Sequence, residues 1–162
     1  MIQSLEAGRA DVARDILEAL PDWFSNRDAR ETYINNVEKM PMLLANNEDQ
    51  PVGFLSLKAH SKRHQEIFLI GLRPEFRRQG IGTSLVEYAI STAQRRGSNF
   101  LSVKTLAARS PDPHYAETRA FYTAVGFQFH EELPTLWGPN APCAVYLMDL
   151  NARRRRVSQA PS

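Results

Sequence analysis

The segment from Glu66 to Arg95 constrains the fold more than any other part of the chain. After Glu66 the residues through Leu72 are apolar or glycine at successive positions, which is typical of a strand buried on both faces in the middle of a sheet. Pro74 ends that strand, and from Gly80 onward apolar residues recur three and four positions apart, as on one face of a helix. The chain therefore contains a central strand that leads through a short turn into a helix, as in α/β folds.

The remaining sequence alternates between strand and helix patterns. Apolar spacing that stops at Pro21 predicts a first helix, and Ser25 or Asn26 can cap a second helix that runs to about Met40. The element order β-α-α-β-β-β-α-β-α-β-β predicts an α/β fold with a mixed sheet and helices on both faces. The predicted strands outside the central one are Ile2–Leu5, Met42–Ala45, Val52–Lys58, Phe100–Leu106, Phe127–Glu131 and Ala144–Leu150, and the last helix is Ala116–Val125.

Length and charge fit one domain with a short tail. The 162 residues, 43% of them hydrophobic, suffice for a single core, so we predict one domain over 1–150 and a basic, mobile C-terminal tail over 151–162. The net charge of +2 depends on four consecutive arginines in that tail, Arg153–Arg156. We infer that the body has no basic face and expect no nucleic-acid partner.

Cysteine and histidine usage argues against disulfides and metal sites. Cys143 is the only cysteine, which fits a reducing cytoplasm and excludes an intrachain disulfide. His60 and His64 are four positions apart, but they fall in a predicted polar loop with no third ligand nearby, so we predict no metal. The sequence also has no long apolar run, and we expect no membrane partner.

The turn between the central strand and its helix has the features of an anion site. Helix N-termini leave backbone N–H groups unpaired, and glycines let a phosphate approach them. The dinucleotide-binding pattern fails because Leu85 stands where a third glycine is needed, and no Gly-Lys-Ser/Thr of a P-loop is present. The residues of the turn are Arg77, Arg78, Gln79, Gly80, Ile81, Gly82 and Thr83.

Two motifs in the same order resemble those of the GNAT superfamily of N-acetyltransferases. Arg77, Gly80 and Gly82 match its Arg/Gln-x-x-Gly-x-Gly/Ala pattern, and the segment Arg119–Phe127 is similar to its Phe-Tyr-x-x-x-Gly-Phe helix and strand. The resemblance implies a centrally splayed sheet, acetyl-CoA as co-substrate and no metal. It places the pyrophosphate on the turn from Arg77 to Thr83.

The resemblance also implies where the rest of the coenzyme binds. The pantetheine arm would pair, like an added strand, with Leu69, Ile70, Gly71 and Leu72. The backbone N–H of Ile70 or Leu72 would polarise the thioester oxygen. Gly71 marks either a bulge that admits the arm or a position of close packing, and the sequence leaves both open.

Acetyl transfer to an amine needs a base for the substrate ammonium and an acid for the leaving thiol. Glu66 begins the central strand, where many members of the family carry a catalytic glutamate, and otherwise it would be a solvent-exposed strand end or a partner of Arg63. Tyr122 matches the family tyrosine near the coenzyme sulfur, and its alternative role is core packing. We expect Phe121 and Val125 to form the apolar face of its helix, which would turn Tyr122 toward the cofactor. Less favoured bases are Glu117, Glu131 and Glu132.

Three aromatic loops are the candidates for the acceptor site. The side chains considered are Trp23, Phe24, Tyr33, His114 and Trp137, although core or lid packing is the common role of such aromatics. Cys143 has no base adjacent in sequence, so direct attack within a ternary complex is favoured over a covalent route. We therefore predict transfer to a primary amine of a small molecule. The alternatives are a protein amine and a non-catalytic acyl-CoA-binding module, and the sequence leaves a homodimer open.

Overall fold

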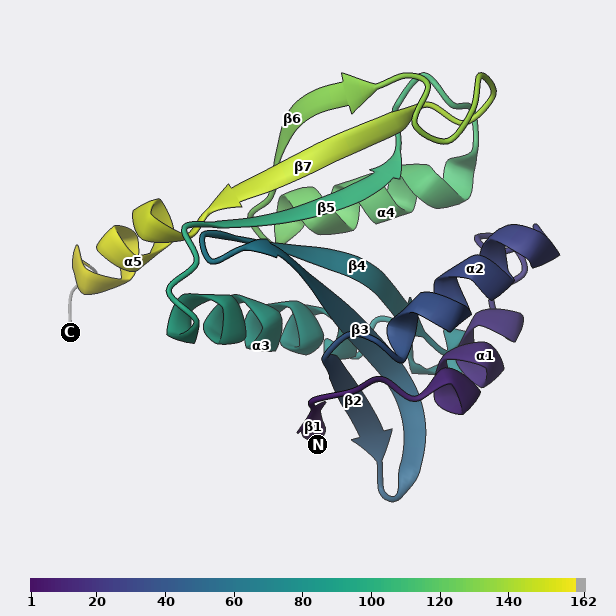
Figure 1. Cartoon of the computed structure of the whole chain (residues 1–162), viewed down its shortest axis with the longest axis horizontal. Coiled ribbons are helices and arrows are strands. Elements are labelled where there is room, and N and C mark those ends of the chain that lie inside the picture. The colour runs from purple at the N-terminus through teal and green to yellow at the C-terminus, as the bar shows by residue number, and fades with distance from the viewer. Residues whose placement is uncertain (160–162) are drawn as a thin grey trace. The chain divides into compact units, whose positions relative to one another are not determined.

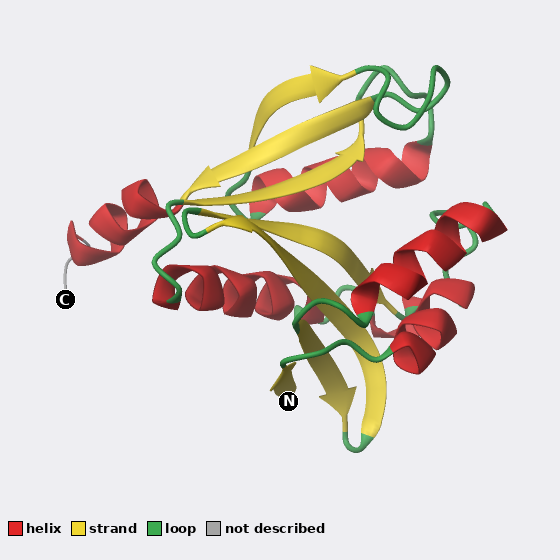
Figure 2. Cartoon of the chain, in the orientation of Figure 1, coloured by secondary structure: helices red, strands yellow, loops and turns green. Residues whose placement is uncertain are grey.

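The computed structural model describes residues 1–159, which form two compact units. One unit comprises Met1–Lys58 with Ile67–Ala89, and the other comprises Ala59–Glu66 with the chain from Ile90 onward. Figure 1 labels the elements, and Figure 2 colours them by type. They are β1 Ile2–Leu5, α1 Ala10–Glu18, α2 Arg27–Val37, β2 Met42–Asn47, β3 Gln50–Ser61, β4 His64–Leu72, η1 Pro74–Phe76, α3 Ile81–Arg95, β5 Phe100–Leu106, α4 Pro113–Ala124, β6 Gln128–Leu133, β7 Cys143–Asp149 and α5 Leu150–Gln159.

The strand order is β1-β2-β3-β4-β5-β7-β6, and the predicted α/β fold class is confirmed. In the first unit, β1 pairs antiparallel with β2, with Ile2 opposite Ala45. The β2 strand pairs antiparallel with β3, with Met42 opposite Ser56 and a register shift just after Ala45. The sequence predicted this hairpin with a turn over 46–50, but the ladder continues to the pair Asn47 and Gln50.

The core of the first unit lies under α1 and α2, which pack side by side (Figure 1). The predicted cap of α2 is Asn26, whose side chain accepts a hydrogen bond from the backbone N–H of Ala29 at 3.0 Å. The apolar spacing of α1 puts its buried residues on one side, as expected for an amphipathic helix. The buried cluster consists of Val12, Ala13, Ile16, Leu17, Leu20, Ile34, Val37, Met42, Leu44, Phe54 and Leu69.

The second unit is built on β5, β7 and β6, with α4 packed against β5 and β6 (Figure 2). The β7 strand is antiparallel to both of its neighbours, so β5 and β6 run in the same direction on either side of it. Leu106 lies opposite Cys143 at one end of the β5–β7 ladder, and Phe100 lies opposite Asp149 at the other. Helix α4 connects β5 to β6 and brings Tyr122 into the interior of this unit.

The predicted polar loop around His60 and His64 is wrong. His60 lies in β3 and His64 lies in β4, with only two residues between the strands. The strands could not be recognised from the sequence, because the segment around His60 and His64 is polar and alternates only weakly between apolar and polar residues. Contacts within the second unit, described below, hold these histidines in place instead.

The predicted tail also needs correction, because residues 150–159 form the helix α5. The Asp149 side chain caps it by accepting from the backbone N–H groups of Asn151 and Ala152, at 2.9 and 3.0 Å. Leu150 is fully buried at its start. Arginine is a good helix former, so four in a row do not oppose a capped helix. The last part of the predicted tail, 160–162, lies outside the described residues.

Candidate functional site

The segment between β4 and α3 forms a tight turn at the start of a helix. The short helix η1 follows Arg73, and α3 begins at Ile81. Two residues of the turn, Arg78 and Gly80, have left-handed backbone with φ of 59° and 81°. Backbone N–H groups in such a turn can point to one side and bind an anion. The predicted anion turn thus contains two left-handed residues, and its role in binding a phosphate stays a prediction.

Gly80 is required for its backbone conformation rather than for space. A Cβ atom there would meet no heavy atom within 4 Å, but a φ of 81° is strained for any residue with a side chain. The carbonyl of Gly80 accepts the first helical hydrogen bond, from the N–H of Ser84 at 3.0 Å. The N–H groups of Ile81, Gly82 and Thr83 thus precede the helical ladder, where N–H groups lack intrahelical acceptors and suit a phosphate.

Arg77 stacks on the ring of Trp23, a residue predicted from the sequence to contact the acceptor. Its guanidinium carbon lies 4.0 Å from the ring centroid of Trp23, and both side chains are half-buried. Trp23 follows α1, and its backbone N–H donates to the carbonyl of Leu20 at 3.2 Å. A cation stacked on an indole is stabilised by the ring quadrupole and fixed in orientation. The structure therefore joins Trp23, a candidate acceptor residue, to the anion turn.

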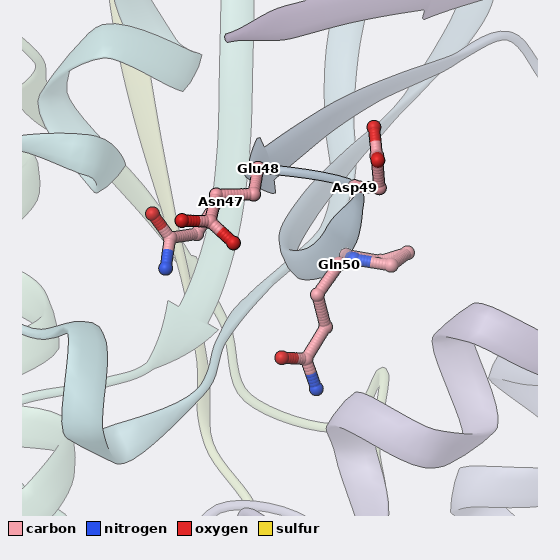
Figure 3. Close-up of a pocket in the computed structure, with 5 residues that line it drawn as sticks. Asn47, Glu48, Asp49 and Gln50 are labelled. Carbon is pink, nitrogen blue, oxygen red and sulfur yellow. The ribbon is translucent and has the colours of Figure 1, made fainter.

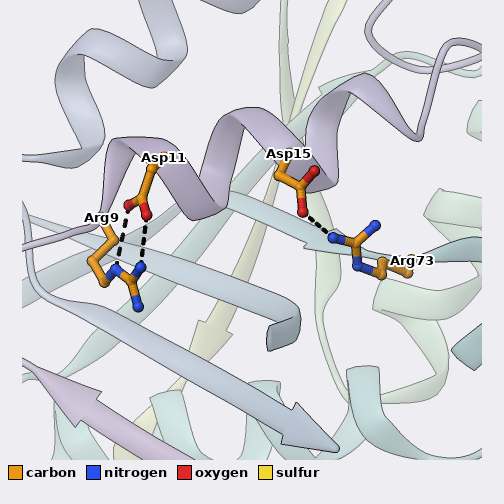
Figure 4. A network of polar contacts seen from close by, with 4 residues as sticks. All are labelled: Arg9, Asp11, Asp15 and Arg73. Carbon is orange, nitrogen blue, oxygen red and sulfur yellow. Dashed lines mark hydrogen bonds and ion pairs between the residues drawn. The ribbon is translucent and has the colours of Figure 1, made fainter. Parts of the chain in front are cut away.

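Arg73, which was not among the predicted site residues, anchors the end of β4. Its guanidinium forms an ion pair with Asp15 of α1 (Figure 4). It also donates through Nε to the carbonyl of Pro51 at 3.3 Å. Its backbone N–H donates to the carbonyl of Val52 at 2.9 Å. These contacts fix the residue from which the anion turn starts. An arginine directly after a buried strand was the signal in the sequence.

The strand residues Leu69 to Leu72 alternate in burial. Leu69 and Gly71 are buried, and Ile70 and Leu72 are half-buried. A Cβ on Gly71 would lie 3.0 Å from Phe54 and 3.2 Å from Ile16, so this glycine is explained by close packing, one of the two readings that the sequence left open.

Glu66 is neither a solvent-exposed strand end nor a partner of Arg63, which were the two structural alternatives considered from sequence. It is 4% exposed and lies within β4, in the second unit. One carboxylate oxygen forms an ion pair with Lys104 of β5, and the other lies 2.9 Å from Nε2 of His60. A buried carboxylate needs such partners because the interior does not solvate its charge. Lys104 could not be predicted from the sequence, because the residues of one strand do not show which residue of the neighbouring strand will face them.

The two histidines extend this polar group. The rings of His60 and His64 stack at 4.7 Å, and Nε2 of His64 lies 2.7 Å from the hydroxyl of Ser102. Burial lowers the pKa of His64 below the usual 6.5, and the neighbouring His60 adds to the effect. His60 and His64 therefore belong to the surroundings of Glu66.

Tyr122 is the buried residue within α4; Phe121 and Val125 were predicted to form the core face, and of these Val125 is buried. Tyr122 is 3% exposed and packs edge-on against Phe127, with ring centroids 5.8 Å apart. Phe121 is only half-buried. Burial raises the pKa of Tyr122 well above its usual value, with a smaller contribution from Tyr115. The phenol is therefore protonated at neutral pH, the form that donates a hydrogen bond.

The aromatic acceptor candidates of the first unit form a small cluster. Tyr33 of α2 lies 6.2 Å from Phe24 and 5.6 Å from Phe68, both in edge-on geometry. All three are half-buried and pack on the main core. Phe68 was not among the predicted residues, although its place two positions after Glu66 on β4 could have indicated it.

The remaining candidates lie in the second unit. The Asp112 side chain caps α4 by accepting from the backbone N–H of His114 at 2.9 Å. Trp137 is 38% exposed in the loop between β6 and β7. Among the less favoured bases, Glu132 pairs with Arg109, and Glu117 and Glu131 are exposed.

Cys143 is fully buried, and burial raises the pKa of its thiol to about 11. A thiol of that pKa holds little of the reactive thiolate at neutral pH. Across residues 1–159, no group of three or more His, Cys, Asp or Glu could hold a metal ion. None of the described helices is long and apolar enough to cross a membrane.

A surface hollow at the β2–β3 turn does not belong to the anion turn. Figure 3 shows its lining, which comes from the single segment Asn47–Pro51. It contains the carboxylates of Glu48 and Asp49 and no cation, which is the wrong charge for a phosphate.

Comparison with known proteins identifies the family. The model of the acetyltransferase (GNAT) family matches residues 10–127, so the chain belongs to this family of acetyl-CoA-dependent acyltransferases. The resemblance seen in the two sequence motifs is thereby confirmed. A search of curated sequences finds no match.

Solved structures share the fold at low sequence identity. A GNAT-family protein from Desulfovibrio desulfuricans is 16% identical with a TM-score of 0.78, over 93% of this chain and 99% of that one. A GNAT family acetyltransferase from Elizabethkingia anophelis with acetyl-CoA bound is 18% identical with a TM-score of 0.70, over 92% and 97%. An aminoglycoside 6'-N-acetyltransferase complexed with coenzyme A is 19% identical with a TM-score of 0.71, over 93% and 97%.

The lowered pKa of His64 predicts a loss of stability in acid. Because the unfolded chain binds this proton more readily, the contribution of His64 is complete above pH 6.5 and is lost as the pH falls toward the folded-state pKa. We expect His64→Gln, which can keep the contact with Ser102, to lose less unfolding free energy than the wild type between about pH 7.5 and about pH 5.5. Urea denaturation at both values measures this, with the exposed His130→Gln as the matched control. An unchanged pH dependence in His64→Gln would contradict it.

Proposed function

We propose that residues 1–150 act as one catalytic domain that moves the acetyl group of acetyl-CoA to a primary amine of a small molecule, by direct attack within a ternary complex. The observation that carries this proposal is the backbone of the turn from Arg77 to Thr83, with left-handed Arg78 and Gly80 at the start of α3. In this proposal the turn binds the pyrophosphate through backbone N–H groups. Arg77, oriented by Trp23, adds positive charge.

The pantetheine arm is proposed to lie along β4, with a backbone N–H of Ile70 or Leu72 donating to the thioester oxygen. A backbone donor there stabilises the oxyanion that forms as the amine attacks. The half-burial of Ile70 and Leu72 supports this, because Leu69 and Gly71, which alternate with them along the strand, face a packed core.

Glu66 is proposed as the base for the substrate ammonium. The amine nitrogen attacks the thioester carbon, its surplus proton passes to the carboxylate directly or through a water, and the carbon–sulfur bond breaks. The ion pair with Lys104 supports the role because it fixes the position of the carboxylate, as a general base requires. Of the four candidate glutamates, Glu66 is the one that is buried.

Tyr122 is proposed to act on the departing sulfur. Its phenol donates a hydrogen bond to the thiolate as negative charge develops there. Complete proton transfer is unfavourable because burial raises the pKa of Tyr122 far above that of an ordinary thiol. The coenzyme A thiolate is therefore protonated either by the proton that Glu66 accepted from the amine or by solvent. The number of protons balances over the cycle.

A small amine is the proposed acceptor because Phe24, Tyr33 and Phe68 form a compact, half-buried aromatic cluster. Aromatic faces bind cationic amines. A panel of small amines and peptide N-termini, followed by release of free coenzyme A thiol, tests this part. Turnover with peptides alone would contradict the small-molecule assignment, and saturable binding without turnover would favour a non-catalytic acyl-CoA module.

Coenzyme binding is expected to depend on Gly82. Gly82→Glu places a carboxylate at the start of α3, where it competes with the phosphate and repels it, so we expect the Kd for acetyl-CoA to rise by about 10-fold or more. Calorimetric titration measures the change. Ser91→Glu adds the same charge at an exposed site later in α3 and should bind as the wild type does. Equal weakening in both variants would count against the turn as the phosphate site.

Removal of the proposed base should change the pH profile. We expect Glu66→Gln to lower kcat/KM about 100-fold and to abolish the fall in rate that protonation of the carboxylate produces at acid pH. Glu132→Gln, which alters a less favoured base, should behave as the wild type does. Calorimetry with acetyl-CoA checks that Glu66→Gln remains folded. A retained acid limb in Glu66→Gln would assign the base elsewhere.

Removal of the Tyr122 hydroxyl should affect turnover rather than binding. We expect Tyr122→Phe to lower kcat about 100-fold with the Kd for acetyl-CoA unchanged, since the phenol acts only on the developing thiolate. Tyr146→Phe removes the hydroxyl of another buried tyrosine of the second unit and is the matched control. Equal turnover in the two variants, measured as thiol release, would refute the role of Tyr122.

A further inference from the structure

The second unit gathers exposed cations that lie far apart in the sequence. They come from the β3–β4 turn, the C-terminal end of α3 and the helix α5, which lie next to one another in Figure 1. We call them the arginine surface, which consists of Lys62, Arg63, Arg95, Arg96, Arg154, Arg155 and Arg156, all exposed.

Hydrogen bonds join these segments into one surface. The carbonyl of Arg63 accepts from the backbone N–H groups of Asn99 and Phe100, at 2.7 and 3.0 Å. The carbonyl of Asn99 in turn accepts from Leu150 at 2.8 Å, which seats the start of α5. Arg154 donates to the carbonyl of Gln94 at 2.7 Å, which ties α5 to the end of α3.

The charge of the chain is divided unevenly between its units. The second unit carries 11 Lys and Arg against 6 Asp and Glu, a net charge of +5, whereas the first carries 9 against 12, a net charge of −3. The acidic residue next to the arginine surface, Asp149, is used to cap α5. Asp149 is already counted in the net charge of +5, so positive charge predominates in the second unit.

An aromatic ring stands among these cations. Phe100, at the start of β5, is 39% exposed and bonds through its backbone to Arg63. Arginine binds phosphate with a planar fork of donors, and an exposed aromatic ring offers a face on which an unpaired base can stack. On α5 the large exposed hydrophobic residue is Val157, which is too little for a face that inserts into a membrane.

We propose that the arginine surface binds single-stranded nucleic acid, with the phosphates on its arginines and a base stacked on Phe100. This reverses the expectation from composition, which assigned the excess charge to a short tail. The proposal stands on a surface separate from the anion turn in the chain and does not depend on acetyl transfer. Binding is expected to be weak and salt-dependent, because few phosphates are contacted.

The test is fluorescence anisotropy of a labelled oligouridylate titrated with the full chain between about 50 mM and about 200 mM salt. Removing two phosphate contacts in Arg155→Gln/Arg156→Gln should reduce the slope of log K against log salt by about 1.4 and weaken binding several-fold. Arg27→Gln/Lys39→Gln removes two exposed cations from the first unit and should leave binding unchanged. Equal loss in both variants, or no binding by the wild type at low salt, would overturn the proposal.

Two further measurements distinguish the ligand class and guard against misfolding. Phe100→Leu should weaken oligouridylate but not polyphosphate, which has no bases, and equal effects on both would refute the stacking. Binding to phosphatidylglycerol vesicles without binding to oligouridylate would replace the proposal with a membrane surface. Calorimetry with acetyl-CoA shows that each variant is folded, and Lys62→Gln/Arg96→Gln serves as a second charge variant should Arg155→Gln/Arg156→Gln lose structure.

Discussion

A carboxylate on a buried strand must find its counter-charge within the protein, and on β4 this constraint falls on Glu66. Water solvates it little at 4% exposure, so its charge is balanced by Lys104 and by a contact with His60. His60 in turn stacks on His64, and His64 meets Ser102 of β5. One buried charge thus organises a polar group that spans β3, β4 and β5 in the second unit. The same enclosure that makes Glu66 costly to bury would keep bulk water away from the proton transfer proposed for it.

In the first unit the electrostatic question is different, because its predicted anion turn has to attract a negative charge rather than balance a buried one. Its anion turn offers backbone N–H groups, which are neutral and lie near the surface, where water can solvate them when no phosphate is bound, together with one positioned cation. Stacking on Trp23 orients Arg77 without neutralising it, so its charge remains available to a ligand. Arg73, by contrast, is committed to Asp15 and to the carbonyl of Pro51 and serves to fix the end of β4. Two arginines four residues apart therefore have different tasks, which follow from their neighbours.

Membership in the acetyltransferase family and the fold follow from patterns that are local in sequence. Apolar periodicity, Pro74 after the central strand and Asn26 as a helix cap each act within a few residues, and all of the predicted helices and strands are present. The errors share one cause. The strands at His60 and His64 and the helix after Asp149 lack apolar periodicity and are held by partners distant in the chain, such as Ser102 and Asn99. Sequence patterns carry little information about such long-range contacts.

The sequence by itself determined the element order, the glycine turn before α3 and the residue types at Glu66 and Tyr122, because backbone propensity and apolar spacing are properties of a single segment. Only the tertiary structure decided which of these residues are buried, that Lys104 faces Glu66, that Trp23 reaches Arg77, and that arginines from three segments form one surface. Those outcomes depend on which strands and helices become neighbours, and electrostatic and cation–π energies depend on distances of a few ångströms across elements. The charged residues can be listed from the sequence, but only the fold determines which of them lie close enough together for their electric fields to add.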